Sequence, residues 1–382
     1  MIYFDNSATS FPKPEIVYRT MDDFMRREAG NPGRSGHKLA VSASLALTRT
    51  RLHLARLFHV ADADRIVFTL NATDALNLAL KGFLREGDHV VTTSMEHNSV
   101  VRPLAALRRL GVRHTRVPCD VTGLVDVADI AAAVESRTRM IVMSHASNVV
   151  GTVQPIATVG RLARERGLIF LVDAAQSAGV LPIDVEADMI DLLAFPGHKS
   201  LYGPTGTGGL YVGPRVSLTP QREGGTGSES EQEDQPERLP DRFESGTQNT
   251  VGIAGLGAGV EFVLAEGLER IAAHERALTQ RLLDGLAQIP GVALYGSQDA
   301  SRRTAAVSFN LAGWEPVDLG AVLDQSFDIA VRPGLHCAPA AHQTIGTFPQ
   351  GTVRLSPGYF NTPAEVDFVL EAIAKLSVSG LP

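Results

Sequence analysis

A lysine and an aspartate near the middle of the chain have the types and positions needed for chemistry on an aldehyde cofactor. Lys199 closes a Gly-His-Lys turn directly after the apolar segment 192–195, where a lysine amine could form a Schiff base. Asp173 ends the apolar segment 168–173, and a carboxylate buried there needs a cationic partner, which a protonated pyridine nitrogen would supply. The pair therefore predicts pyridoxal 5'-phosphate (PLP), whose chemistry needs one covalent and one electrostatic anchor. The plainer alternatives are a solvated surface lysine and an aspartate that caps a helix.

Polar residues that follow other apolar segments could complete such a site. Asn71-Ala72-Thr73 stands between a strand-like and a helix-like segment, so backbone amides and the Thr73 hydroxyl could bind a phosphate. The same residues could simply cap the helix. His97 could stack on the ring of the cofactor, or it could be an ordinary core histidine. Asn148 and Gln176 could contact the phenolic oxygen of the cofactor.

Cys337 stands between Arg332 and Arg354, which suggests a nucleophile beside a carboxylate-binding site. An arginine fork binds the carboxylate of an amino acid through two hydrogen bonds. The neighbouring imidazole of His336 would raise the thiolate fraction of Cys337. The alternatives are a buried structural thiol and a metal ligand acting with His336 and His342, but a fourth ligand at a fitting spacing is lacking, so we predict no metal site. Cys119, at the end of another apolar segment, is expected to be structural.

An alternation of strands and helices must position these residues. Near-continuous apolar strands separated by helices predict an α/β fold with a mostly parallel sheet between two layers of helices. In such sheets ligands bind at the carboxyl ends of the strands, where most of the polar residues above fall. The predicted strands are 65–69, 89–93, 112–117, 139–144, 168–173, 192–195 and 209–212, and the first helices run from about 71 to 84 and from about 99 to 110.

The remainder of the chain predicts a second, smaller α+β domain. The segment 221–241 is rich in glycine and acidic residues and is expected to be a solvated loop, with a lid or partner-docking loop as the alternative. The helical pattern over 251–286 is expected to connect the two domains, a large one over 15–255 and a small one from 1–14 and 256–382. The predicted strands of the small domain are 292–295, 305–311, 329–331 and 352–356, followed by a helix over 363–376 that Thr362 caps.

Composition excludes several classes of protein. The 382 residues have a net charge of −7 with acids and bases scattered along the chain, whereas nucleic-acid or anionic-membrane partners demand a basic face. No apolar run is long enough to span a bilayer, and the first residues do not read as a signal peptide. Two cysteines cannot build a disulfide framework, so we expect a cytoplasmic protein.

A set of short motifs extends this interpretation along nearly the whole chain. With these motifs the chain resembles the class V branch of the fold type I PLP-dependent enzymes. Within that branch it is most similar to the short-loop (type II, SufS-like) cysteine desulfurases and the selenocysteine lyases. The segment Arg332-Pro333-Gly334-Leu335-His336-Cys337-Ala338 points to the desulfurases in particular. The other motifs are segments 3–9, 31–37, 96–99, 147–152, 172–176, 197–199 and 243–247.

The resemblance implies a role for each residue named above. It implies that Lys199 carries PLP, that Asp173 lies at the pyridine nitrogen and that His97 stacks on the ring. Gln176 and Asn148 would contact the phenolic oxygen. The phosphate would be bound by Thr73, His198 and the amide of Ala72, joined by Thr247 from the second subunit of a homodimer. The substrate would be bound by Arg354, Arg332, Asn148 and His37.

The implied reaction is the cleavage of L-cysteine to L-alanine, with the sulfur left on Cys337 as a persulfide. His97 is the candidate for moving protons to and from the substrate sulfur. The persulfide would pass to a thiol or an acceptor protein, which the acidic residues of 229–237 could steer. The alternatives are a selenocysteine lyase, an aminotransferase or epimerase of class V, and a non-catalytic PLP-binding regulatory subunit.

Three positions depart from the pattern of the family. Pro196 stands where many desulfurases have a serine that contacts phosphate. Leu335 replaces the first histidine of the His-His-Cys form common in the short-loop group, and the segment 339–342 that follows is also unusual.

Overall fold

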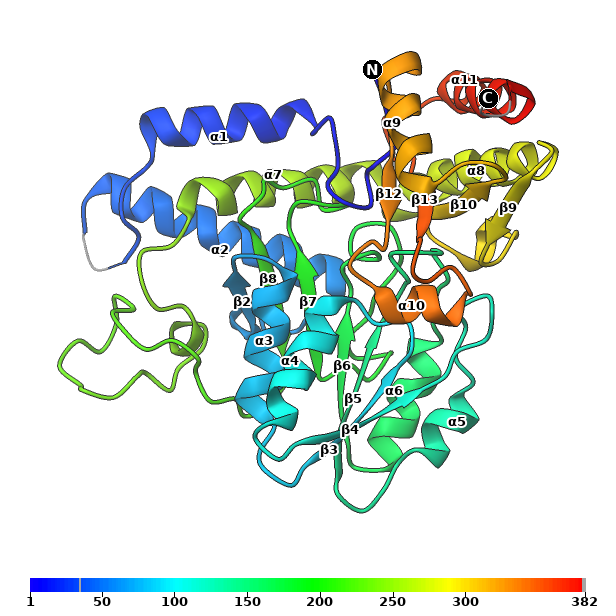
Figure 1. Ribbon diagram of the computed structural model, residues 1–382. Helices are drawn as coiled ribbons and strands as arrows, with labels where there is room; N and C mark the ends of the chain where they lie inside the picture. The colour runs from blue at the N-terminus through cyan, green and yellow to red at the C-terminus, as the bar shows by residue number, and fades with distance from the viewer. Residues whose placement is uncertain (34–35, 380–382) are drawn as a thin grey trace.

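The computed structural model describes residues 1–33 and 36–379, so Arg34 and Ser35 of the 31–37 motif lie outside it. A seven-stranded sheet with the order β2-β8-β7-β6-β5-β3-β4 forms the centre of the molecule (Figure 1). The strands β3 to β7 are parallel to one another, and β8 is antiparallel to both β2 and β7. The strands are β2 (Ile66–Thr69), β3 (His89–Thr93), β4 (Arg113–Val117), β5 (Thr138–Ser144), β6 (Ile169–Asp173), β7 (Leu192–Pro196) and β8 (Gly208–Val212). The predicted α/β class with a mostly parallel sheet is confirmed.

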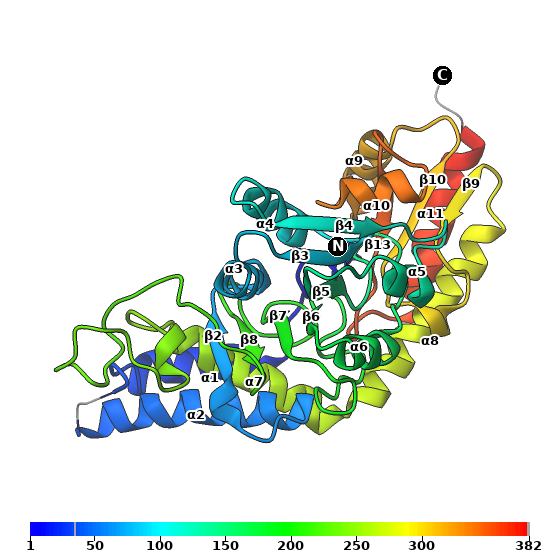
Figure 2. The same cartoon turned by 90° about the horizontal axis from the view of Figure 1, so that it is seen from below.

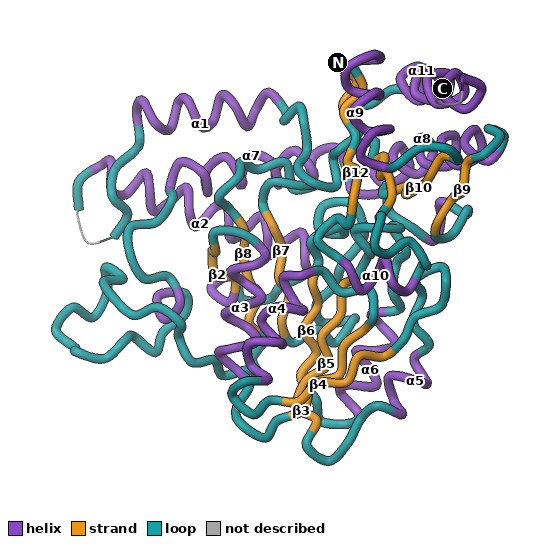
Figure 3. Tube along the Cα trace, viewed as in Figure 1, coloured by secondary structure: helices purple, strands orange, loops and turns teal. Residues whose placement is uncertain are grey.

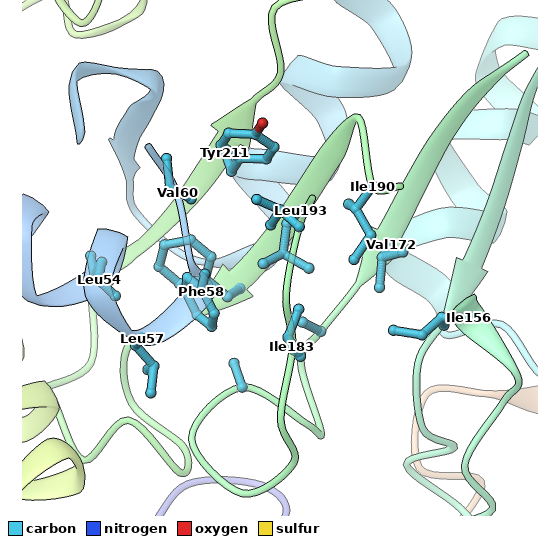
Figure 4. Packing of buried hydrophobic residues seen from close by; sticks show 14 of the residues in the cluster. Leu54, Leu57, Phe58, Val60, Ile156, Val172, Ile183, Ile190, Leu193 and Tyr211 are labelled. Atoms are coloured by element: carbon cyan, nitrogen blue, oxygen red, sulfur yellow. The ribbon is translucent and has the colours of Figure 1, made fainter. Parts of the chain in front are cut away.

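The sheet has a hydrophobic core on each face, which explains why its strands are apolar throughout. In β6, Phe170 and Val172 belong to one core, whereas Ile169 and Leu171 belong to the other, because successive side chains of a strand point to opposite faces. Figure 4 shows part of the first core, to which Leu54 and Phe58 of a covering helix and Leu193 of β7 belong. The second core contains side chains of α3 and α4.

Helices cover both faces of the large sheet (Figure 2). Those that contribute to the first core are α2 (Lys38–Phe58), α5 (Val127–Ala132), α6 (Ile156–Glu165), α7 (Thr250–Glu266) and, through Ile271, the start of α8 (Leu268–Ala287). Those on the opposite face are α3 (Ala72–Phe83) and α4 (Asn98–Arg108), and α1 (Glu15–Arg27) packs on α7. Short 3-10 turns occur at η1 (Ala63–Arg65), η2 (Asp241–Phe243) and η3 (Ala300–Arg302).

Small residues along α7 allow α1 and α2 to approach it closely. A Cβ added at Gly257 would lie 2.3 Å from Oγ1 of Thr50 in α2, and one added at Gly255 would lie 2.7 Å from Cγ of Met21 in α1. Thr50 is not free to move away, because its Oγ1 donates to the carbonyl oxygens of Ala46 and Ile253, both at 3.0 Å. Overpacking at such a contact is destabilising.

We therefore expect Gly257→Ala to lower the free energy of unfolding by about 1–3 kcal/mol, even though alanine favours helices over glycine by about 1 kcal/mol. Urea unfolding followed by circular dichroism measures the change. Gly225→Ala is the matched control, since nothing lies within 4 Å of a Cβ at Gly225. Equal stability of the two variants would contradict the close packing described for α2 and α7.

A smaller antiparallel sheet with the order β12-β13-β10-β9 lies beside the large one. Its strands are β9 (Val292–Tyr295), β10 (Val307–Leu311), β12 (Arg332–Gly334) and β13 (Thr352–Leu355). A third hydrophobic core joins it to α8 (Leu268–Ala287), α9 (Pro316–Phe327) and α11 (Pro363–Ser379). The short helix α10 (Pro339–Thr344) follows β12, and β1 (Ile2–Tyr3) pairs in parallel with β11 (Ile329–Ala330).

The last helix, α11, begins at Pro363, as the sequence predicts. The amide of Glu365 donates to Oγ1 of Thr362 at 3.3 Å, and the amide of Thr362 donates to Oε2 of Glu365 at 2.7 Å, which is a reciprocal capping box. The predicted boundary between the two domains at residue 255 falls within α7, and the division itself remains a prediction.

The segment between β8 and α7 is almost entirely loop, as Figure 3 shows. As predicted, residues 221–240 form neither a helix nor a strand, and most of them are exposed. Within the described ranges no single helix is long and apolar enough to cross a membrane. The helices α7 and α8 taken together have the length and composition of a membrane span, but the chain bends by 83° at the break between them. The apolar residues of α7 are largely buried against neighbouring elements.

Candidate active site

One pocket of about 230 Å³ lies at the carboxyl ends of the central strands. Residues of both sheets and of the N-terminal segment line it. The predicted site residues among them are Ala72, Thr73, His97, Asn148, Asp173, Gln176, His198, Lys199, Arg332, Cys337 and Arg354. Thr247 and His37 are the predicted residues that the pocket does not include.

Asp173 and Lys199 come from neighbouring strands. Asp173 ends β6 and pairs with Ala194 of β7, which leads into the turn that contains Lys199. Burial raises the pKa of Asp173, against the opposing effects of the Ala175 amide, which donates to Oδ1 at 2.9 Å, and of the Lys199 charge. Only Oδ1 of Asp173 therefore has the capping role that was the predicted alternative. Oδ2 has no protein partner among the described residues.

Burial lowers the pKa of Lys199 to about 8, with help from the charges of Arg354 and Arg332 and against the attraction of Asp173. A lysine whose pKa lies near neutrality has a substantial fraction of its amine in the nucleophilic, uncharged form. The side chain is therefore prepared for attack on an aldehyde in a way that a solvated surface lysine is not.

This shift gives a testable pH dependence. The neutral amine attacks, so the rate at which the cofactor-free protein takes up PLP should rise with pH through the pKa of Lys199 and level off above it. We expect a midpoint near 8, whereas an ordinary lysine would give a midpoint near 10.5. Stopped-flow absorbance between pH 6 and pH 10 measures the rate, and a midpoint near the ordinary value would contradict the burial argument.

The turn that carries Lys199 is held by the N-terminal segment. The carbonyl oxygen of His198 accepts hydrogen bonds from Oγ1 of Thr9 (3.0 Å), the amide of Ser10 (3.1 Å) and Nζ of Lys13 (2.7 Å). Sequence reasoning identified the motif 3–9 only through the family resemblance, and it did not identify Ser10 or Lys13. Nothing local in the sequence links these residues to a turn almost 190 residues away.

The start of α3 has the features of a phosphate site. Asn71 caps the helix through Oδ1, which accepts the amide of Asp74 at 2.9 Å, so the amides of Ala72 and Thr73 remain outside this cap. Oγ1 of Thr73 lies 2.7 Å from Oγ of Ser99. Nδ1 of His198 is buried without a hydrogen-bond partner in the part of the chain that the structure describes. An anion bound here would face a helix N-terminus and an unpaired ring nitrogen.

Thr247 and His37 lie elsewhere. Thr247 borders a second depression that also contains Gly33 and Arg51. His37 is exposed, and its Nδ1 accepts the amide of Ala40 at 3.2 Å, so it caps α2. Within one subunit neither residue reaches the pocket.

His97 is neutral near pH 7, and its geometry defines which nitrogen carries the proton. Burial, with the charge of Lys199, lowers its pKa to about 4. Nδ1 accepts the amide of Ser99 at 3.1 Å, so the proton resides on Nε2. The imidazole caps α4 and also lines the pocket.

Asn148 connects three parts of the site. Its Nδ2 donates to the carbonyl oxygen of His336 at 2.6 Å, its own carbonyl oxygen accepts from Arg354 at 2.7 Å, and its Oδ1 is buried without a protein partner among the described residues. Gln176 is engaged on one side only, where Nε2 donates to the carbonyl oxygen of Ser7 at 3.0 Å.

The two arginines meet at a carboxylate that the sequence analysis did not assign. Arg354 is 2% exposed and donates to Oδ1 of Asp5 at 2.8 Å, while Arg332 lies 3.5 Å from the other oxygen. Nε of Arg354 is buried and unpaired within residues 1–33 and 36–379. Asp5 belongs to the motif 3–9, so the signal was present, but its partner stands 349 residues further on.

Cys337 is exposed and lies at the rim of the pocket. Its carbonyl oxygen accepts the amide of Asn98 at 2.8 Å, which ties the segment to the start of α4. The expectation that His336 activates this thiol is wrong in its geometry, because both ring nitrogens of His336 have other partners. The second cysteine, Cys119, is half-buried, and burial raises its pKa to about 11, as suits the structural role predicted for it.

No group of three or more side chains suited to hold a metal ion occurs among the described residues, although His336 and His342 do meet.

Comparison with known proteins gives one consistent result. The family model described as aminotransferase class-V matches residues 2–369. A probable cysteine desulfurase of Methanothermobacter thermautotrophicus is 37% identical over 385 residues, which cover 99% of this chain and 95% of that protein. A cysteine desulfurase of Salmonella dublin is 34% identical and covers 98% of this chain and 93% of its own length.

Solved structures agree with the sequence relatives. The apo structure of cysteine desulfurase from Thermococcus onnurineus is similar with a TM-score of 0.92 at 34% identity, covering 99% of this chain and 95% of that one. The cysteine desulfurase CsdA of Escherichia coli, in an S-sulfonic acid form, is similar with a TM-score of 0.88 at 28% identity, covering 100% of this chain and 95% of that one.

Proposed function

The chain belongs to the aminotransferase class-V family, and from that premise we propose that it is a PLP-dependent cysteine desulfurase whose sulfur acceptor is Cys337. One observation carries the assignment of residues. A single pocket contains a buried aspartate, a half-buried lysine from the turn after the neighbouring strand, two arginines and an exposed thiol. An aminotransferase or an epimerase has no use for that thiol.

The residues present fit PLP. Oδ2 of Asp173 is available for a pyridinium nitrogen, Oδ1 of Asn148 and Nδ1 of His198 are buried without protein partners in the described chain, and the first turn of α3 can take a phosphate. Lys199, His97 and Gln176 would complete the set. When bound, PLP supplies an electron sink that stabilises a carbanion at the substrate Cα.

Side chains of the protein itself bind the substrate and move its protons. Arg354, with Arg332, holds the substrate carboxylate, which takes the place of Asp5 as their partner. The amine of Lys199 would remove the Cα proton and could return it, since its lowered pKa suits both directions. His97, neutral with its proton on Nε2, donates and recovers a proton at the substrate.

Sulfur transfer occurs at Cys337. The thiolate attacks the substrate sulfur, an S–S bond forms, and the C–S bond breaks with its electron pair left on the carbon fragment. Proton transfer to that fragment gives L-alanine, and the persulfide remains on Cys337 until an acceptor thiol attacks it. The ties from Cys337 to Asn98 and from His336 to Asn148 fit a cysteine held in place rather than one on a long mobile arm.

A homodimer is part of this proposal. Thr247 and His37 have no route to the pocket of their own subunit, and each would act at the pocket of the other. Large apolar side chains on α1 and α2 are exposed in the single chain, as expected of a surface that a second copy covers, and they include Tyr18, Met25, Leu45 and Leu52. A sulfur-acceptor protein and a cytoplasmic location remain predictions.

The test uses purified protein loaded with PLP. It is given L-cysteine without reductant, alanine is quantified, and the intact mass is measured. We expect alanine together with the mass of one added sulfur atom. A bound cofactor with neither product would overturn the proposal. A parallel assay with L-selenocysteine identifies a selenocysteine lyase if only that substrate yields alanine.

A further inference from the structure

Two buried histidines stack behind the segment that carries Cys337. His342, on α10, is fully buried, and His336, next to the cysteine, is 6% exposed. Their rings are 5.3 Å apart at an angle of 28°, and Nδ1 of His336 lies 3.1 Å from Nε2 of His342. Neither residue has a part in the chemistry described above.

The carbonyl oxygen at one end of this pair fixes every proton in it. Nε2 of His336 lies 2.9 Å from the carbonyl oxygen of Arg332, which can only accept, so His336 carries its proton on Nε2 and accepts on Nδ1. His342 must then donate from Nε2 and accept on Nδ1, and Oγ1 of Thr347 donates to that atom at 2.7 Å. Burial keeps both rings neutral, which agrees with this single arrangement. The chain of hydrogen bonds therefore runs in one direction from Thr347 to Arg332.

These hydrogen bonds support the backbone of His336 and Cys337, which has a disfavoured conformation. His336 and Cys337 have φ values of 50° and 56°, a left-handed conformation that side chains disfavour. The bond from the His336 ring to the Arg332 carbonyl closes the loop over the intervening residues. The rings thus connect the Arg332 backbone, the two left-handed residues and α10, which Ala338 and Ala341 anchor in a separate apolar cluster.

We propose that His342 is a positioning residue, which acts through His336 to hold the Cys337 thiol at the distance from the substrate that sulfur transfer requires. This inference rests on the proposed function, since it takes Cys337 to be the sulfur acceptor. Reacting groups misplaced by about 1 Å lose about 100-fold in rate, so a loosened support should slow sulfur transfer without weakening substrate binding.

The test compares His342→Leu with His342→Gln. Leucine cannot donate to His336, whereas the side-chain amide of glutamine can. We expect His342→Leu to take up PLP normally and to keep KM for L-cysteine within about twofold, while persulfide formation on Cys337 slows by about 10- to 100-fold. His342→Gln should recover most of that rate. Hydrogen exchange in the cofactor-free protein should show faster exchange of the Asn98 amide, which Cys337 protects, in the leucine variant only.

His89→Leu is the matched control, because His89 is also buried and bonded to two threonines, Thr138 and Thr115, but on β3 away from the pocket. If it slows persulfide formation as much as His342→Leu, the effect is one of stability and the proposal is overturned. Equal rates for the leucine variant and the wild type would also overturn it. Should His342→Leu fail to fold, Thr347→Val is the second variant, because it removes only the hydroxyl that donates to Nδ1 of His342. It should likewise slow persulfide formation and leave KM for L-cysteine nearly unchanged. If the proposed function is wrong, the wild type makes no persulfide. The support that His342 gives is then still visible, because the Asn98 amide exchanges faster in His342→Leu than in the wild type.

Discussion

Replacement of Lys199 by alanine is expected to lower alanine formation from L-cysteine by about 10,000-fold, because it removes both the covalent anchor of the cofactor and the group that moves the Cα proton. The buried position of this amine, with its pKa near 8, is what fits it for both tasks. Lys199 is the only lysine among the described residues that line the pocket, and nearby Lys13 donates to Ser10 and to the backbone of the turn.

The measurement combines alanine quantification with borohydride reduction of the loaded protein. Reduction should fix the cofactor to the peptide that contains Lys199 in the wild type and leave Lys199→Ala unlabelled. Lys81→Ala is the control, since Lys81 is exposed on α3, and it should behave as the wild type. A label on another lysine of the wild type, or retained activity in Lys199→Ala, would show that the anchor lies elsewhere.

Replacement of Cys337 by alanine should abolish the added sulfur mass and lower alanine formation from L-cysteine by about 1,000-fold or more, because Cys337 is the only cysteine among the described residues that line the pocket. PLP uptake should be unchanged. Cys119→Ala is a control of the same chemistry within the same chain, because Cys119 is half-buried with a pKa raised to about 11 and lies outside the pocket.

Intact mass and alanine are measured for both variants after exposure to L-cysteine. Sulfur on Cys337 in the wild type and in Cys119→Ala, with none in Cys337→Ala, is the expected pattern. Full alanine production by Cys337→Ala would mean that sulfur leaves by another route and would contradict the transfer step. Sulfur found on Cys119 would mean that the acceptor lies outside the pocket.

The large sheet could be predicted well from sequence because its strands are buried on both faces. Such strands are nearly continuous in apolar residues, and the polar residue at the end of each is conspicuous, as Asp173 is. The direction of β8 could not be predicted, because a short apolar strand has no feature that records whether its neighbours are parallel or antiparallel. The sequence prediction also gave no range for the helices α1, α2, α5, α6, α9 and α10 or the strands β1 and β12. Of these, α5, α10, β1 and β12 have six residues or fewer, too few for a periodic pattern to show.

The chemically distinctive residues of the site could be predicted for the same local reason, whereas their supports could not. Lys199 and Cys337 stand in unusual turns that draw attention by themselves. Asp5 and Lys13 matter only through contacts that the fold creates, because Asp5 pairs with Arg354 near the other end of the chain and Lys13 donates to His198 in its middle. His342 was considered only as a metal ligand, because the spacing of two histidines does not reveal that their rings bond to each other.

The contacts of the N-terminal segment also determine when the site can exist during protein synthesis. Residues 2–6 pair with residues 328–361 through β11, Ser356 and Asn361, and the ion pair of Asp5 reaches Arg354. A ribosome makes the first of these segments long before the second. The large sheet can fold while synthesis continues, as domains generally do. Arg332, Cys337 and Arg354, however, join it only when the last part of the chain has emerged. A chain stalled before residue 332 thus contains Lys199 without Cys337 and without either arginine, so under the proposed function a half-made protein has no means of releasing sulfur in the cell.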